Sequence, residues 1–301
     1  MDTKSSPSTS TKMSSTTPCK FLFSVFWLRS TPTPLQSPHT TVCSLFPLSL
    51  HRGAINGSLD KLEAKGKLSC TADEARANIT TSTDLAAAAE DCDLIIEAIV
   101  ENLPVKLDFY KNLGNLTSSG QILASNTSSF PITEMALASG RPEDVVGLHY
   151  FNPVQIMKLV EVVSTEHTLA SNVDAVTAYV ERTGKVGVPC GDTPGFIVNR
   201  LLVPYIVQGV AMLARGDAKA EDIDMAMRLG AGHPMGPITL SDYVGNDINL
   251  AVMKGWVERY PDDPAFQAPE AMELLEKMVA DNKLGRKTGE GFFKWDGNKK
   301  L

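Results

Sequence analysis

The residues that could do chemistry lie in one stretch, 121–161, where two polar clusters each follow a short apolar run. The cluster SNTSS (125–129) follows residues 122–124, and the cluster HYFNP, which begins at His149, follows residues 145–148. Glu161 comes twelve residues after His149, on a further run rich in β-branched residues. A histidine that a carboxylate can orient, with hydroxyl and amide side chains nearby, is the outline of a proton-transfer site.

Strands must position these clusters, and the preceding sequence alternates between strand and helix signals. Residues 79–81 favour a short strand, residues 83–84 open an alanine-rich helix, and residues 93–100 (DLIIEAIV) are strongly apolar. A run that is apolar on both faces is typical of a buried parallel strand, and Pro104 stands where a helix over 105–113 can begin. We therefore predict an α/β domain with a Rossmann-like parallel sheet, which holds ligands at the carboxyl ends of its strands.

The character of the chain changes after Asp192. The sequence predicts a first domain over 53–192 and an all-helical C-terminal domain over 193–301. A helix over 171–182 and a strand over 185–189 complete the first domain. Four helices form the second domain, over residues 194–214, 220–229, 238–260 and 269–282. Because the helix over 196–213 is nearly all apolar, we expect it to be buried in a subunit interface or beneath the first domain.

Residues 1–52 differ in kind from the rest of the chain. They are rich in Ser, Thr and Pro and contain no glycine, and no Asp or Glu occurs from Thr3 to Leu59. This composition is typical of an organelle transit peptide, and also of a disordered segment or a stretch that is not the cellular N-terminus. Within it, residues 19–28 (CKFLFSVFWL) could form a strand.

Composition and charge exclude several classes of function. The formal net charge of −7 and the pI of about 5.3 argue against nucleic acid as a general partner. No apolar run reaches the length of about 18 residues that indicates a membrane span. The five cysteines are scattered along the chain, which favours a reduced compartment with neither a disulfide framework nor a metal site.

Three further motifs accompany the stretch 121–161: DTPGFIVNR (192–200), LGAGHPMGP (229–237) and KTGEGF (287–292). Together they resemble the 3-hydroxyacyl-CoA dehydrogenase family, in order and spacing, from about Gly53 to the end of the chain. The resemblance implies NAD-dependent oxidation of (S)-3-hydroxyacyl-CoA to 3-oxoacyl-CoA, an acyl-CoA substrate, and a homodimer formed through the helical domain. It implies that His149 is the general base and that Glu161 orients it.

The resemblance also carries roles for other residues. It implies that Ser128 and Asn199 contact the substrate oxygen and the cofactor, and that Asn152 helps to place the loop or the acyl group on the cofactor side. The remaining implied positions are Glu101, Lys106 and Lys287 at the nicotinamide end, and Ser58 and Lys65 at the CoA moiety. The alternatives are a helix-capping acid at Glu101, an exposed lysine at Lys106 and a solvated helix face at Lys65.

The resemblance fails before Gly53, and this leaves a second hypothesis open. A dinucleotide site needs a glycine-rich turn after its first strand, and residues 1–52 offer none. The alternative is a non-catalytic acyl-CoA-binding or dimerising subunit without a working NAD site. Loss of the central strand predicts two open inner edges and low stability, unless residues 19–28 replace that strand. The compartment stays open between mitochondrial matrix, peroxisome and cytoplasm.

Overall fold

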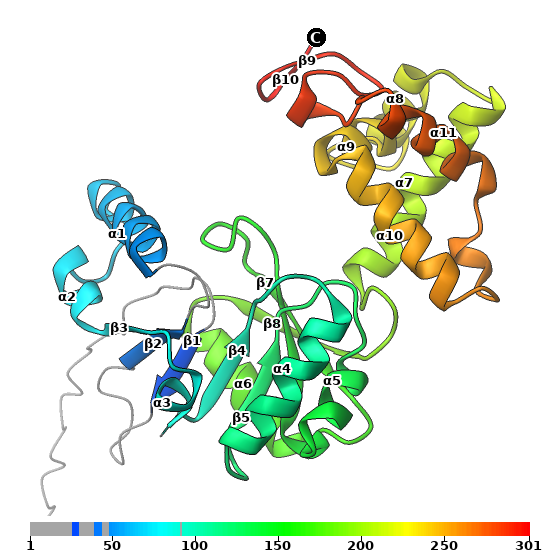
Figure 1. The fold of residues 1–301 in the computed structure, drawn as a ribbon. Helices are drawn as coiled ribbons and strands as arrows, with labels where there is room; N and C mark the ends of the chain where they lie inside the picture. The colour runs from blue at the N-terminus through cyan, green and yellow to red at the C-terminus, as the bar shows by residue number, and fades with distance from the viewer. Residues whose placement is uncertain (1–25, 30–38, 44–47, 91) are drawn as a thin grey trace, which may run out of the picture. The chain divides into compact units, whose positions relative to one another are not determined.

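The structure is a computed structural model that describes residues 26–29, 39–43, 48–90 and 92–301. The chain forms two compact units (Figure 1). Unit 1 comprises the residues up to Thr127 together with Ile132–Pro189, and unit 2 comprises Ser128–Pro131 together with Cys190–Leu301. Unit 1 is an α/β domain of the Rossmann-like type and unit 2 is helical, as the sequence predicts.

An eight-stranded sheet forms the centre of unit 1, in the order β3-β2-β1-β4-β5-β6-β7-β8. The pairs β2–β3, β4–β5 and β5–β6 are parallel, whereas β1 is antiparallel to both neighbours and β6–β7 is antiparallel. The expected parallel sheet is therefore a mixed one. The strands are β1 Phe26–Arg29, β2 His39–Cys43, β3 Ile79–Ser82, β4 Leu94–Glu97, β5 Ile122–Ser125, β6 Val145–Tyr150, β7 Leu159–Ser164 and β8 Val186–Gly191.

Strand β1 occupies the centre of the sheet, between β2 and β4. It comes from the run 19–28 that could replace a central strand, although residues 19–25 lie outside the described residues. Its register pairs Phe26 with Ile96 and Leu28 with Leu94, so its carboxyl end lies at the edge where β4 begins. Residues 26–29 and 39–43 thus form strands, and the next helix begins at Leu48, whereas the transit-like character expected of residues 1–52 stays a prediction.

Three helices of unit 1, over residues 72–77, 85–89 and 103–116, begin at capping residues visible in the sequence. Thr71 forms a capping box with Glu74, Asp84 accepts two backbone N–H groups, and the Asn102 side chain accepts the N–H of Val105 at 3.2 Å. The helix cap is therefore Asn102 rather than Glu101. The helices are α1 Leu48–Ala64, α2 Ala72–Ala77, α3 Leu85–Ala89, α4 Leu103–Leu116, α5 Ile132–Ser139, η1 Pro142–Asp144 and α6 Ala170–Arg182.

The core of unit 1 lies on both faces of the sheet. Leu94, Ile96, Val146 and Leu148 belong to one buried cluster together with residues of α6, such as Val180. The alternate strand positions are buried as well, among them Ile95 and Leu123, and α4 and α5 pack against each other. Burial on both faces explains why the run 93–100 is apolar throughout.

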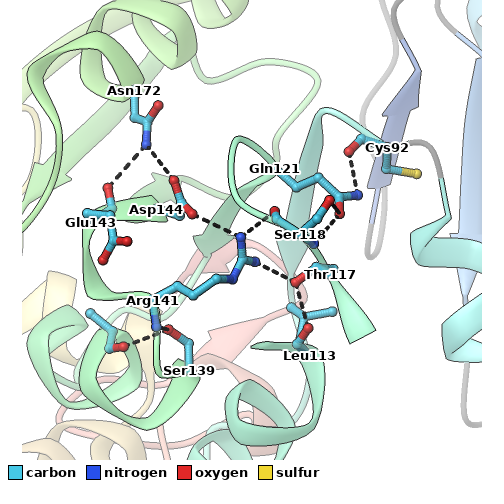
Figure 2. Close-up of polar contacts among 11 residues, drawn as sticks. Cys92, Leu113, Thr117, Ser118, Gln121, Ser139, Arg141, Glu143, Asp144 and Asn172 are labelled. Atoms are coloured by element: carbon cyan, nitrogen blue, oxygen red, sulfur yellow. Dashed lines mark hydrogen bonds and ion pairs between the residues drawn. The ribbon is translucent and has the colours of Figure 1, made fainter. Parts of the chain in front are cut away.

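A cluster of polar side chains closes the edge where β5 and β6 begin (Figure 2). The Arg141 guanidinium donates to the Ser118 carbonyl, the Thr117 hydroxyl and, at 2.9 Å, the Asp144 carboxylate. The Gln121 amide donates to the carbonyls of Ala89 and Cys92, at 2.9 and 2.7 Å. We call these side chains the Arg141 cluster. It ties together the loops that precede the two strands.

Unit 2 consists of helices around a second apolar core. The helix expected over 238–260 is two helices, because Gly245 adopts a φ of 114°, which ends one helix before the next begins. The elements are α7 Val198–Arg215, α8 Ala220–Gly230, α9 Pro237–Val244, α10 Asn246–Arg259, η2 Pro264–Phe266, α11 Pro269–Ala280, η3 Arg286–Thr288, β9 Trp295–Asp296 and β10 Lys299–Lys300. Asp242 anchors the last segment, since its carboxylate accepts the N–H groups of Phe292 and Phe293, both at 2.8 Å.

The cysteines differ from expectation at one position. Cys70 is disulfide-bonded, which differs from the reduced cysteines that the sequence favours, although one bond is not a disulfide framework. Cys92 and Cys190 form no disulfide bond. Among the described residues, no three His, Cys, Asp or Glu side chains are grouped to hold a metal ion, and no described helix has the length and apolarity to cross a membrane.

Candidate active site

His149 and Glu161 face each other on the antiparallel strands β6 and β7. The strand register pairs the two residues directly, and His149 Nδ1 lies 2.7 Å from Glu161 Oε2. Both are buried, with 3% and 0% of their surfaces exposed. A directly opposed pair on one sheet face brings side chains into contact without any loop, so the backbone holds this geometry rigidly. The closeness predicted from the sequence is confirmed.

The arrangement of this pair assigns a role to each ring nitrogen. If Nδ1 carries the proton that it shares with Glu161, Nε2 is the nitrogen that can accept another. The carboxylate then stabilises the imidazolium that forms. The Phe151 ring lies 4.5 Å from the imidazole, centroid to centroid, and helps to fix its plane. This is the geometry of a general base or acid.

The end of β5 is tied to the end of β6 through Asn126. Its backbone N–H donates to the Glu97 carbonyl at 2.8 Å, and its side-chain oxygen accepts the N–H of Tyr150, also at 2.8 Å. Tyr150 is the residue after His149. The two polar clusters of the sequence therefore meet at the carboxyl ends of neighbouring strands.

A closed set of polar contacts, whose members are buried except for Glu101, lies beside them, and we call it the Glu97 ring. Lys106 Nζ lies 2.7 Å from Glu97 Oε1 and 3.2 Å from Glu101 Oε2. Glu101 Oε1 accepts from the Thr127 hydroxyl at 2.6 Å, and the Thr127 N–H donates to the Ser125 hydroxyl at 3.2 Å. Ser125 Oγ returns to Glu97 Oε2 at 2.7 Å. Only 1% of the Lys106 side chain is exposed, so the alternative of an exposed lysine is wrong.

Sequence reasoning missed Glu97, Ser125 and Thr127 as members of this ring. Glu97 sits within the run DLIIEAIV, where it passes as one polar residue in an apolar strand. A signal was nevertheless present: a carboxylate in a strand buried on both faces must find a cation and donors, and Lys106 follows within the next helix. A lone acid in such a run is therefore worth pairing with the nearest basic residue.

Three predicted site residues belong to unit 2. The Asn199 amide donates to the Ser128 backbone carbonyl at 3.3 Å, which joins the start of α7 to the segment 128–131. Lys287 Nζ lies 2.6 Å from Asp247 Oδ2, a partner that the sequence did not indicate. Asn199 and Ser128 are thus brought together, and Lys287 is held by α10.

The residues predicted at the CoA moiety lie along one side of α1. Ser58 is half-buried, and Lys65 is exposed immediately after the helix. Leu62 lies four residues after Ser58 and three before Lys65, so the three share a helix face. Leu62 also lines a cavity of about 330 Å³, whose other walls are Lys67, the loop 154–158 and the turn 183–185.

The cavity carries positive charge. Lys67, Lys158 and Lys185 line it, and none of its other lining residues is acidic. Lys185 donates to the Met157 carbonyl at 2.7 Å, and burial lowers the pKa of its ammonium group. The predicted residue Asn152 is exposed in the turn that follows β6, ahead of the loop that forms one wall. The cavity suits an anion attached to an apolar group.

The carboxyl edge of the sheet is suited to a dinucleotide at β4 but not at β1. Glu101 and Lys106 stand where β4 ends and α4 begins, at the carboxyl edge expected to hold such a ligand. The central strand β1 runs the other way, so a phosphate-binding turn cannot follow it at this edge. Besides α4 after β4, the helix α1 follows a strand at this edge, since it begins at Leu48 after β2.

Comparison with known proteins places the chain in context. Residues 47–193 match the NAD-binding domain of 3-hydroxyacyl-CoA dehydrogenase, and residues 195–295 match its C-terminal domain. The mitochondrial hydroxyacyl-coenzyme A dehydrogenase of Sus scrofa is 51% identical over 218 residues, which cover 72% of this chain and 68% of that protein. A probable 3-hydroxybutyryl-CoA dehydrogenase of Deinococcus radiodurans is 45% identical over 244 residues, 81% of this chain and 86% of that one. The crystal structure of (S)-3-hydroxybutyryl-CoA dehydrogenase from Ralstonia eutropha matches with a TM-score of 0.78 and 35% identity, over 85% of this chain and 90% of the other.

Proposed function

The chain belongs to the 3-hydroxyacyl-CoA dehydrogenase family, and from the geometry of unit 1 we propose that His149 is its general base. The family reaction is the NAD-dependent oxidation of 3-hydroxyacyl-CoA to 3-oxoacyl-CoA, and the non-catalytic alternative is not favoured. The observation that carries the proposal is the buried contact of 2.7 Å between His149 Nδ1 and Glu161 Oε2. NAD, when bound, accepts the hydride.

The proton step belongs to the two paired side chains. His149 Nε2 removes the proton of the substrate hydroxyl, while Glu161 holds Nδ1–H and stabilises the imidazolium. In the reverse direction the imidazolium returns the proton to the oxygen of the 3-oxo group. A positioned base of this kind contributes about 10²–10⁴ in rate. Burial of both side chains keeps bulk water from competing for the proton.

Ser128 and Asn199 of unit 2 have proposed catalytic roles of their own. We propose that they hold the substrate oxygen and the cofactor, with Asn152 assisting on the cofactor side. Support comes from the bond between the Asn199 amide and the Ser128 carbonyl, which fixes both residues relative to each other. Lys287 is proposed at the nicotinamide end, where Asp247 would set the direction of its ammonium group.

We propose that Glu101 and Lys106 hold the nicotinamide half of NAD. Support comes from the Glu97 ring, which immobilises both side chains at the carboxyl edge of the sheet. The pyrophosphate must be held differently from the usual glycine turn, because β1 is antiparallel and residues 1–52 contain no glycine. Titration of the full chain with NADH, followed by protein and cofactor fluorescence, tests whether the site binds.

Ser58 and Lys65 are proposed to hold the CoA moiety, with the cavity beside α1 as the place for its charged end. Support comes from the shared helix face and from the three lysines of the cavity wall. A charge reversal, Lys65→Glu, should raise the KM for acetoacetyl-CoA and leave the Kd for NADH unchanged. Equal effects on both constants would count against the assignment.

Residues 193–301 are proposed to form a dimerisation domain, and residues 53–192 a cofactor domain. Support comes from two leucines of the helical unit, Leu201 and Leu229, which are 69% and 81% exposed. A water-exposed leucine of this size is readily covered by a second copy. Light scattering during gel filtration should give a dimer for the wild type, and a Leu229→Asp chain should shift toward monomer.

A mitochondrial matrix location is proposed over cytoplasm or peroxisome. Support comes from the mitochondrial name of the Sus scrofa relative and from the acid-poor composition of residues 1–52. Import of the full chain into isolated mitochondria, with protection from added protease, is the expected result. A chain that stays outside and protease-sensitive would contradict it.

The first experiment is the consumption of NADH by the purified chain with acetoacetyl-CoA, beside a His149→Gln chain. We expect turnover by the wild type and a loss of about 10²–10⁴ in kcat for the variant. Equal activity of both chains would overturn the role of His149. Absence of turnover with acetoacetyl-CoA still bound would overturn the dehydrogenase function of this chain and restore the binding-subunit hypothesis.

A further inference from the structure

The ammonium group of Lys185 is partly buried without a counter-charge. Lys185 lies in the turn between α6 and β8 and is half-buried. Its ammonium group donates to two neutral acceptors, the backbone carbonyls of Val154 and, at 2.7 Å, Met157. No carboxylate of the described residues pairs with it, and burial alone lowers its pKa. An ammonium group has three donors, so one is left for a further acceptor.

Two more lysines line the same cavity, each from a different segment. Lys158 directly precedes β7, and its carbonyl accepts the N–H of Val186 at 2.8 Å, beside Lys185. Lys67 follows α1, in a turn where its N–H donates to the Leu62 carbonyl at 2.9 Å. Within the described ranges, neither side chain pairs with a carboxylate. Three cations thus meet at one cavity of about 330 Å³, whose lining includes no acidic residue.

This gathering of positive charge contrasts with the rest of the chain. The formal net charge is −7, and basic side chains elsewhere have acidic partners, such as Lys254 with Glu276 at 2.6 Å and Lys283 with Glu290 at 3.0 Å. Like charges around one cavity repel one another, and an anion between them replaces this repulsion by attraction. Three lysines left without acids around one cavity therefore point to an anionic ligand.

The size and the apolar lining of the cavity limit the ligand further. Leu62, Val154, Ile156 and Met157 contribute apolar surface, and Ile156 and Met157 are 70% and 40% exposed. Small-molecule sites usually have volumes of about 300–1,000 Å³, so this cavity lies at the lower end of that range. It can hold one charged group and an apolar neighbour, but it is too small for a whole acyl-CoA molecule.

The number of lysines indicates which anion the cavity suits. A phosphate monoester carries a charge of about −1.5 to −2 at pH 7, whereas each phosphate of a pyrophosphate diester carries a single charge. Lysine is a common ligand of phosphate, to which it acts as a point charge. CoA contains one phosphate monoester, at the 3′ position of its ribose, next to the flat adenine ring.

We propose that the cavity is a phosphate-monoester site, in which Lys67, Lys158 and Lys185 hold the 3′-phosphate of CoA and so select CoA over its dephospho form. The inference rests on the proposed place of the CoA moiety beside α1, at Ser58 and Lys65. The three lysines determine specificity and touch no reacting atom. They therefore act on binding of the substrate and leave the proton step unchanged.

The test is the ratio of two dissociation constants, for dephospho-CoA and for CoA, measured on the full chain by calorimetry at fixed ionic strength. The two ligands differ only in the 3′-phosphate. We expect the wild type to bind CoA at least about tenfold more tightly, as hydrogen bonds to a charged group allow. NADH has no phosphate monoester, so its Kd is the internal reference and should be the same in every lysine variant of the cavity.

Variants of the lysines locate the phosphate. Lys67→Gln and Lys158→Gln each remove one charge at an exposed position, so both should fold and should lower the ratio about two- to fivefold. Lys185→Met also loses the bonds to two carbonyls, and it should lower the ratio most. Lys111→Gln is the matched control, because Lys111 is an exposed lysine of α4 outside the cavity lining. It should leave the ratio unchanged.

Lys65 is the rival ligand for the phosphate. Lys65→Gln should weaken CoA and dephospho-CoA alike, because Lys65 is proposed to hold another part of the molecule. A ratio that falls in Lys65→Gln, but in neither Lys67→Gln nor Lys158→Gln, would place the phosphate on the helix face and overturn the inference. Adenosine 3′,5′-bisphosphate that still binds to a chain saturated with CoA would show that the cavity takes a separate ligand, which overturns it too.

The remaining outcomes separate this inference from the proposed function. A wild-type ratio near one, in a chain that consumes NADH with acetoacetyl-CoA, overturns the phosphate site and leaves the dehydrogenase function standing. The expected ratio in a chain without turnover overturns the function and leaves the phosphate site standing. A chain that binds neither CoA nor dephospho-CoA overturns the proposed place of the CoA moiety, and the inference with it.

Discussion

The two edges of the unit 1 sheet both carry buried charged groups, but these groups have different partners. At the edge where β5 and β6 begin, the Arg141 guanidinium donates to the Ser118 carbonyl, the Thr117 hydroxyl and Asp144, all in adjoining loops. At the opposite edge, His149 contacts Glu161, and the Glu97 ring joins side chain to side chain across β4, α4 and β5.

The difference concerns which groups each set of contacts joins. Donors of the Arg141 cluster end on loop carbonyls and loop side chains, which satisfies groups that would otherwise be buried without partners. Contacts at the other edge hold the His149 imidazole against the Glu161 carboxylate and join the charged side chains of the Glu97 ring. We therefore expect changes at the first edge to alter the free energy of unfolding, and changes at the second edge to alter rate and binding.

The largest effect is expected at Glu161. Glu161→Gln keeps the shape of the side chain but lets its amide donate to Nδ1, which places the imidazole proton on Nε2, where the base must accept. We expect kcat to fall by about 10²–10⁴, while the urea midpoint changes little. A variant that loses stability and keeps its rate per folded molecule would place Glu161 with the structural edge instead.

A change at Arg141 should lower stability and leave kcat unchanged, which is the opposite of the result expected at Glu161. Arg141→Met fills similar space but leaves Asp144 buried without its cation and two loops without their donor. We expect the free energy of unfolding to fall by about 2–4 kcal/mol, with kcat of the remaining folded protein unchanged. Urea unfolding and initial rates on the same sample measure both quantities. A loss of kcat at full stability would show that this edge also serves the reaction.

Two serines offer a matched pair of small changes. Ser125→Ala removes a donor to the Glu97 carboxylate, whereas Ser139→Ala removes contacts to the Ala136 carbonyl and the Arg141 N–H. Bonds to a charged group are worth about 1.5–3 kcal/mol and neutral ones about 0.5–1.5 kcal/mol. Ser125→Ala should therefore destabilise more, and it alone should weaken cofactor binding. Equal costs and unchanged binding in both would remove the distinction between the edges.

Much of this arrangement could be predicted from the sequence, because local patterns fix it. Apolar runs, capping residues and turn residues set the strands and helices of unit 1, and the spacing of His149 and Glu161 places them on successive strands. The direct pairing of the two side chains depends on strand register. A polar residue within an apolar strand, such as Glu161, gives a hint of that register but does not determine it.

Three features had no decisive local signal. The direction of β1 is set by its neighbours β2 and β4, and a four-residue strand pairs with either direction. The break at Gly245 lies in a continuous helical pattern, where a single glycine can be tolerated or can end the helix. The role of Glu97 depends on Lys106, Ser125 and Thr127, which meet only once three elements have packed.

The smallest effect concerns pH and links Tyr110 to the functional edge. Burial, and then the Glu97 charge, raise the pKa of Tyr110 well above its usual value near 10. The folded chain therefore keeps this proton where the unfolded chain loses it. The associated stability is fully present well below pH 10 and declines as pH rises from about 10 toward the folded pKa.

Tyr110→Phe should remove this contribution, so its free energy of unfolding should fall less steeply above pH 10 than that of the wild type. Tyrosine absorbance near 295 nm should show that Glu97→Gln lowers the pKa of Tyr110, because one cause of the shift is gone, whereas Asp144→Asn leaves it in place. An equal shift in both variants would mean that Tyr110 responds to the charge of the whole unit. It would then carry no information about the edge that holds the base.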